Sequence, residues 1–161
     1  MNYKSVLFFL GIHSLFVSFF SILNILYSIY FDFILDLNSY SITFIISLAI
    51  GSLFCYIGRH FSKNISLTEQ ITFIVLSFFL IPLLISIPYF LSIYNIGLLN
   101  SYFESISGFT TTGFSIIENV QNIDEPLLLW RSSSQWLGGF LFLLALNIEF
   151  SRERKKKKLF V

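Results

Sequence analysis

The sequence predicts an all-α membrane protein with four transmembrane helices and a short re-entrant segment between the third and the fourth. Hydrophobic residues make up 55% of the 161 residues and charged residues only 12%, whereas soluble chains carry roughly 25% charge. Mean hydropathy is +0.79. Several apolar segments approach the roughly 20 residues that a helix needs to cross the hydrocarbon core. A short polar stretch, SGFTTTGFSI at 107–116, lies between the last two of these apolar segments.

Each of the four predicted helices is a mostly apolar segment bounded by polar or charged residues. Their predicted bounds are Ser5–Phe31, Tyr40–Gly58, Glu69–Ile93 and Leu127–Ile148. The third segment contains Pro82 and Pro88, which membrane helices tolerate but which usually kink them. The fourth begins with the polar stretch LLLWRSSSQWLGG, so hydropathy alone supports it weakly.

The charged residues predict the orientation of the helices. Nine of the ten lysines and arginines lie before the first segment, between the second and third, or after the fourth. The opposite side carries five acidic residues and Arg131 as its only base. Because cytoplasmic loops are enriched in lysine and arginine, we expect a multi-pass protein of the cytoplasmic membrane with both termini in the cytoplasm. The basic residues of 151–161 form a cytoplasmic tail in this interpretation.

The segment between the third and fourth helices, residues 94–126, is the part that hydropathy does not explain. Its first half, LLNSYFESISGF at 98–109, has helical character. At helical rise it spans only about 18 Å, which is too short to cross a bilayer. Two interpretations remain open from the residues alone: a re-entrant half helix, or an amphipathic helix on the outer surface followed by a loose TTTG turn.

If the segment is re-entrant, Thr110–Gly113 can select a cation. Potassium filters use backbone carbonyls in place of the hydration shell. Threonine favours extended backbone because it is β-branched, and Gly113 can adopt positive φ at little cost. The half helix directs its negative C-terminal end toward the same place. No acidic residue lies between 105 and 117, which argues against an acidic filter ring.

Two charged residues and two glycines complete the candidate site. Buried charges in a membrane are costly unless they are paired, so we expect Glu104 and Arg131 to pair and to hold the half helix in place. The alternative is two separate charges that face water. Gly138 and Gly139 resemble a close helix-packing site, although a functional hinge is also open.

These motifs resemble a known family. FESISGFTTTGFSII at 103–117, followed by LLLWRSSSQWLGG at 127–139, is similar to the first pore repeat of Trk/Ktr-type potassium-uptake proteins. IPYFLS at 87–92 resembles the end of the preceding family helix, and GRHF at 58–61 resembles the basic cytoplasmic turn before that helix. The resemblance implies a helix–pore loop–helix unit at 69–150, with two further helices at 1–68 before it. The re-entrant segment is then a pore helix with a filter loop.

The resemblance also implies the roles of the filter residues and the partners. Backbone carbonyls of Thr111, Thr112 and Gly113 would bind potassium, and Thr110 would line the inner edge. The transported ion is then K⁺, with no cofactor. Family members commonly form homodimers and bind a cytoplasmic nucleotide-sensing regulatory subunit.

One pore repeat supplies only a quarter of a filter, which needs about four. Three explanations remain open: an interrupted gene, a split transporter completed by another chain, or an assembly of four copies. A lysine run can be encoded by adenines that favour slippage, so we expect a frameshift or truncation near 150–158. A different class also stays open, namely a small accessory or assembly protein without transport of its own.

Other functions lack their signatures. The sequence has no HExxH motif, nucleophile–base pair or phosphate loop, so we expect no enzyme. A net charge of +1 suggests no nucleic-acid partner. Cys55 is the single cysteine, and His13 and His60 lack the spacing of metal ligands. An intramembrane His13 could relay protons or make one interhelical hydrogen bond.

Overall fold

The computed structural model describes the chain outside residues 1–2, 34–35, 61–65, 95, 118–122 and 160–161, and side chains as far as Leu143. Within these bounds all of the regular secondary structure is helical. The five helices are α1 (Tyr3–Tyr30), α2 (Leu37–Gly58), α3 (Leu67–Leu91), α4 (Leu98–Phe109) and α5 (Glu125–Leu159). α1, α2 and α3 are each long and apolar enough to cross a membrane.

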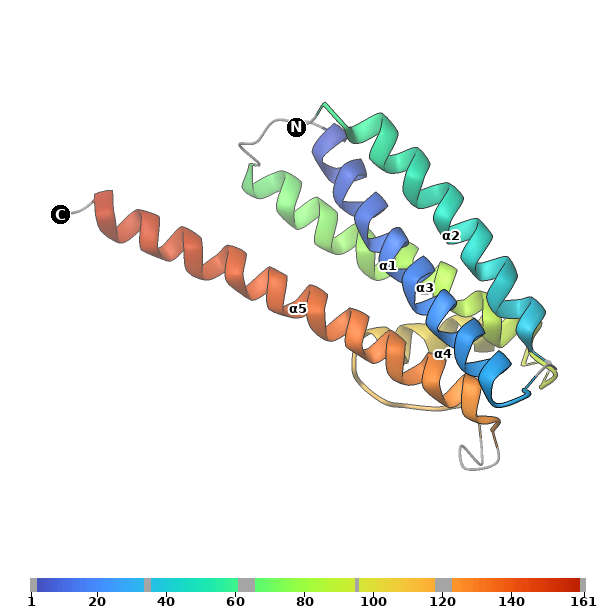
Figure 1. Cartoon of the computed structure of the whole chain (residues 1–161). Coiled ribbons are helices and arrows are strands. Elements are labelled where there is room, and N and C mark those ends of the chain that lie inside the picture. The colour runs from blue at the N-terminus through green and yellow to red at the C-terminus, as the bar shows by residue number, and fades with distance from the viewer. Residues whose placement is uncertain (1–2, 34–35, 61–65, 95, 118–122, 160–161) are drawn as a thin grey trace.

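The helices run up and down in sequence order (Figure 1). The start of α1, the end of α2, the start of α3 and the C-terminal end of α5 lie at one end of the molecule. The short α4 lies near the opposite end, between α3 and α5, and packs against both. The predicted segments therefore correspond to helices, and the bounds of α4 coincide with the predicted 98–109.

The end of α5 differs from the prediction. The helix continues through the basic run to Leu159, whereas we expected the fourth helix to end at Ile148. Lysine, arginine and glutamate are good helix formers, so a charged sequence can extend a helix that hydropathy reports as finished.

α1 and α2 form a closely packed antiparallel pair. A Cβ placed on Gly11 would lie 2.7 Å from Cys55 Sγ, and one on Gly58 would lie 2.7 Å from the Lys4 carbonyl. Small residues of this kind let two membrane helices approach closely. α3 packs against both helices of this pair, and α5 packs against α1.

The carbonyl three residues before each proline of α3 accepts a hydrogen bond from a side chain of another helix. The Phe79 carbonyl, before Pro82, accepts a hydrogen bond from the Tyr102 hydroxyl at 3.1 Å. The Ile85 carbonyl, before Pro88, accepts one from Trp130 Nε1 at 2.9 Å. A proline disturbs the helix ladder in the turn before it, and neighbouring helices can satisfy the carbonyls affected. These two side-chain hydrogen bonds link α3 to α4 and α5.

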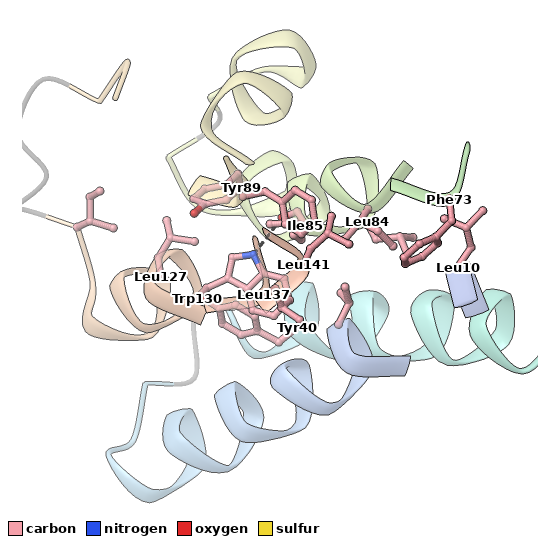
Figure 2. Packing of buried hydrophobic residues seen from close by; sticks show 14 of the residues in the cluster. Leu10, Tyr40, Phe73, Leu84, Ile85, Tyr89, Leu127, Trp130, Leu137 and Leu141 are labelled. Carbon is pink, nitrogen blue, oxygen red and sulfur yellow. Dashed lines mark hydrogen bonds between the residues drawn. The ribbon is translucent and has the colours of Figure 1, made fainter. Parts of the chain in front are cut away.

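Trp130 is the centre of the core near α4 (Figure 2). It is 1% exposed, its ring lies 5.9 Å from that of Tyr40 on α2, and it lies beside Ile85 and Tyr89 of α3. At the C-terminal end of α4, Phe109 is fully buried and its ring lies 5.6 Å from that of Phe78. These aromatic contacts fix the end of α4 from which the TTTG stretch begins.

Candidate functional site: the loop after the half helix

The chain turns sharply where α4 ends. Thr110 has φ −80° and ψ 1°, and its amide donates to the Ile106 carbonyl at 2.8 Å. Thr111 then has φ 59°, a left-handed conformation that is a genuine outlier for a β-branched residue. The extended backbone that we predicted for the threonines is therefore wrong at Thr110 and Thr111. Helices commonly end with a left-handed residue, and here Thr111 takes that position.

Ser107 holds the turned loop against α4. Its carbonyl accepts the amides of Thr112 and Gly113 at 3.1 and 3.3 Å and the Thr112 hydroxyl at 3.1 Å. Its own hydroxyl donates to the Phe114 carbonyl at 2.6 Å. Gly113 has φ 77°, which is the positive φ that we expected a glycine to adopt at this position. Residues 111–116 remain exposed. The loop is therefore held on the side that faces α4 and is accessible on its opposite side.

The structure brings Glu104 and Arg131 together, as the pairing hypothesis predicted. Arg131 Nη1 lies 2.7 Å from Glu104 Oε2, and the side chains are 11% and 0% exposed. The other Glu104 oxygen accepts the Ser115 hydroxyl at 2.7 Å and the Ile116 amide. A buried ion pair is stable only when its remaining hydrogen-bonding groups are also satisfied. The pair meets that condition and joins α4, the loop and α5.

Arg131 also binds the loop backbone directly. Its Nη2 donates to the Gly113 carbonyl at 3.1 Å and to the Phe114 carbonyl at 3.3 Å. The Gly113 carbonyl, which the resemblance assigned to potassium, therefore faces a guanidinium in this conformation. Sequence reasoning missed this contact, and it missed Ser107 and Ser115 as loop supports. Serine spacing carries no signal for contacts that depend on how a turn folds back.

The two glycines of α5 differ. A Cβ on Gly138 would overlap the Phe109 carbonyl at the end of α4, so this glycine allows the two helices to touch. A Cβ on Gly139 would meet no atom of the described chain within 4 Å. The packing prediction is right for Gly138 and wrong for Gly139, because neighbouring helical residues point about 100° apart and only one can face α4.

Comparisons with known proteins give one consistent group of relatives. The chain is 32% identical over 90 residues to an uncharacterized cation transporter of Methanocaldococcus jannaschii, covering 56% of this chain and 19% of that protein. It is 30% identical over 104 residues to the Trk system potassium uptake protein TrkI of Halomonas elongata, covering 65% and 21%. It is 29% identical over 113 residues to TrkH of Escherichia coli K12, covering 69% and 23%.

The matched region spans about a fifth of the length of these relatives. No family profile matches the chain, and no solved structure matches it. These relatives are named as a cation transporter and as potassium uptake proteins. The chain is therefore similar to Trk-type potassium-uptake proteins over part of their length.

Proposed function

We propose that the chain takes part in potassium uptake across the cytoplasmic membrane and contributes one of four filter segments, Thr110–Gly113. One observation carries this proposal. The segment follows a 12-residue helix, and Arg131 of the buried ion pair with Glu104 donates to its Gly113 carbonyl. The chain is also similar to potassium-uptake proteins. A half helix too short to span the bilayer, followed by a fixed polar loop, fits a re-entrant pore loop better than a loose surface turn.

The chemistry of the proposed filter segment rests on its backbone. Thr111, Thr112 and Gly113 are exposed, and the hydroxyls of Thr110 and Thr112 bond back to carbonyls of α4. The hydroxyls therefore tie the loop down, and the threonine carbonyls become the first candidates to bind a dehydrated cation. The C-terminal end of α4 adds a favourable negative potential without a fixed charge.

The wider assembly is part of the proposal. Three further filter segments complete the ring, supplied by additional sequence or by other chains. α5 is the proposed fourth span. Lys4 and Arg59 belong to one end of the bundle and Asp32 and Asp36 to the other, which supports cytoplasmic termini. The resemblance adds a homo-oligomer and a cytoplasmic nucleotide-binding regulatory subunit.

Growth of an uptake-deficient cell on limiting potassium tests the proposal. The chain is expressed by itself and together with the sequence downstream of it, in native form and with Thr111, Thr112 and Gly113 all replaced by alanine. We expect the native form to restore growth once the other filter segments are present, and the alanine form to fail at equal membrane abundance. Equal growth with both forms would instead favour an accessory protein that carries no ion.

A further inference from the structure

One serine in the last turn of α4 contacts most of the proposed filter segment. Ser107 is 4% exposed. Its carbonyl accepts the amides of Thr112 and Gly113 at 3.1 and 3.3 Å, and its hydroxyl donates to the Phe114 carbonyl at 2.6 Å. The same hydroxyl lies 3.2 Å from the Thr112 hydroxyl. The backbone and the side chain of this one residue thus hold three consecutive residues of the loop.

A common helix ending accounts for only part of this arrangement. In a Schellman motif, the second residue beyond the helix donates its amide to a carbonyl in the last turn, and a left-handed residue precedes it. Thr112 and Ser107 form that bond, and Thr111 is the left-handed residue. The bonds from the Gly113 amide and to the Phe114 carbonyl lie outside the motif. Any residue can supply the carbonyl, whereas the bond to Phe114 requires the serine hydroxyl.

The contacts of Ser107 determine where the loop carbonyls point. A trans peptide is planar, with its N–H and its C=O on opposite sides. The amides of Thr112 and Gly113 both point at Ser107. The carbonyls of the residues before them, Thr111 and Thr112, therefore point away from α4. The Phe114 carbonyl points toward α4 instead, because it accepts the Ser107 hydroxyl.

The available carbonyls of the loop are thus a limited set. No hydrogen bond reaches the carbonyls of Thr111 and Thr112 from the part of the chain that the structure describes, and both residues are exposed. The Gly113 carbonyl accepts Arg131 Nη2 at 3.1 Å. Two adjacent carbonyls are therefore free to bind a cation, and the two that follow are held by side chains.

We propose, on the basis of the proposed function, that the Ser107 hydroxyl determines the cation specificity of the filter segment. Ser107 is a positioning residue that does not touch the ion. A filter discriminates between cations by the spacing or by the number of its carbonyls. The hydroxyl keeps the Phe114 carbonyl turned toward α4, so both quantities stay fixed. Without the hydroxyl, only Arg131 holds this carbonyl, at 3.3 Å, and it can turn toward the ion and admit the smaller Na⁺.

The ratio of the KM for Na⁺ to the KM for K⁺ tests this role. It is measured for uptake by the native chain, Ser107→Ala and Ser107→Cys, with the other filter segments supplied and membrane abundance matched. Both variants lose the hydroxyl. Cysteine fills the space and is only a weak donor, so it decides the matter if the alanine variant inserts poorly. The same two changes at Ser105 are the controls, because the hydroxyl of that buried serine donates within α4, to the Tyr102 carbonyl at 2.8 Å.

The specificity should change without a matching loss of rate. We expect the ratio to fall at least about threefold in both Ser107 variants, as the loss of one intramolecular hydrogen bond implies. The maximal rate for potassium should stay close to that of the native chain, and the Ser105 variants should keep the native ratio. Equal ratios in the Ser107 and Ser105 variants would overturn the role of the hydroxyl.

Hydrogen–deuterium exchange of the purified chain in detergent separates this role from the proposed function. The amides of residues 112–116 should exchange faster in the Ser107 variants than in the Ser105 variants, because the loop loses a restraint and opens more readily. Unchanged exchange would show that the hydroxyl does not position the loop. A native form that takes up no potassium would instead refute the proposed function, and the exchange rates would still decide whether Ser107 positions the loop.

Discussion

At the scale of single residues, the guanidinium of Arg131 links α5 to both α4 and the loop of the candidate site. It donates to a carboxylate, to the Ser115 hydroxyl and to two backbone carbonyls of the loop. Arginine suits this role because its planar group offers five donors in a fixed arrangement. The loop conformation is therefore set by a side chain on another helix as much as by its own threonines.

Removal of either member of the ion pair should show energetic coupling. Glu104→Gln or Arg131→Gln leaves a buried charge without its partner, which typically costs about 3–5 kcal/mol. The double variant should cost clearly less than the sum of the two. Denaturant titration of the free energy of unfolding measures this. Additive effects would contradict the pairing, and Arg59→Gln, which removes an exposed arginine over the Tyr56 ring, serves as the control.

The adjacent glycines of α5 allow a matched comparison. Gly138→Ala forces α4 and α5 apart and should cost at least about 1–3 kcal/mol, as overpacking usually does. Gly139→Ala has open space and should be neutral or stabilising by up to about 1 kcal/mol, because alanine favours helix. Melting temperatures of the two variants test the difference. Equal destabilisation by both would mean that α5 does not pack on the end of α4 as described.

At the scale of helices, the docking of α5 depends on one buried tryptophan. Trp130 fills the space between α2 and α3 and donates to the Ile85 carbonyl. This contact also satisfies a carbonyl in the turn before Pro88, so a single side chain serves packing and hydrogen bonding together. α5 in turn carries Arg131, one residue further along the chain.

The second tryptophan provides the control for this contact. Trp130→Phe keeps an aromatic ring but removes the donor, and should destabilise the chain by about 1–3 kcal/mol, because a buried side-chain hydrogen bond is lost and the smaller ring fills less of its space. Trp136→Phe alters a side chain that is 76% exposed and should change stability by less than about 0.5 kcal/mol. Unfolding free energies decide between them, and similar values would remove Trp130 from the docking of α5.

Some helices were easier to predict than others. The helix at residues 98–109 could be predicted because its apolar residues recur at helical spacing and the TTTG stretch ends it. The end of α5 was missed because hydropathy does not detect a charged helix. The left-handed Thr111 and the support by Ser107 depend on how the loop folds back onto the end of α4, and the contacts of Arg131 with the loop join segments that lie apart in sequence. No local pattern encodes such contacts, whereas the Glu104–Arg131 pair could be predicted from the cost of leaving either charge alone.

At the scale of the whole molecule, the bundle separates charge between its ends and holds one polar loop between α3 and α5. Basic residues accompany the ends of α1 and α2 that lie together, and aspartates accompany the opposite ends. The loop is fixed on the side that faces the bundle and open on the other.

The most direct measurement of the central claim is the initial rate of potassium uptake with Gly113→Ala compared with Gly97→Ala. Both glycines have positive φ, 77° and 79°, and a Cβ on either would meet no atom of the described chain within 4 Å. Both glycines therefore combine a positive φ with open space, and they differ in their places in the chain. With the other filter segments supplied and membrane abundance matched, Gly113→Ala should abolish uptake or reduce it at least about tenfold, equivalent to about 1.4 kcal/mol, while Gly97→Ala retains most of it. Equal uptake by the two variants would contradict the assignment of Thr110–Gly113 as a filter segment.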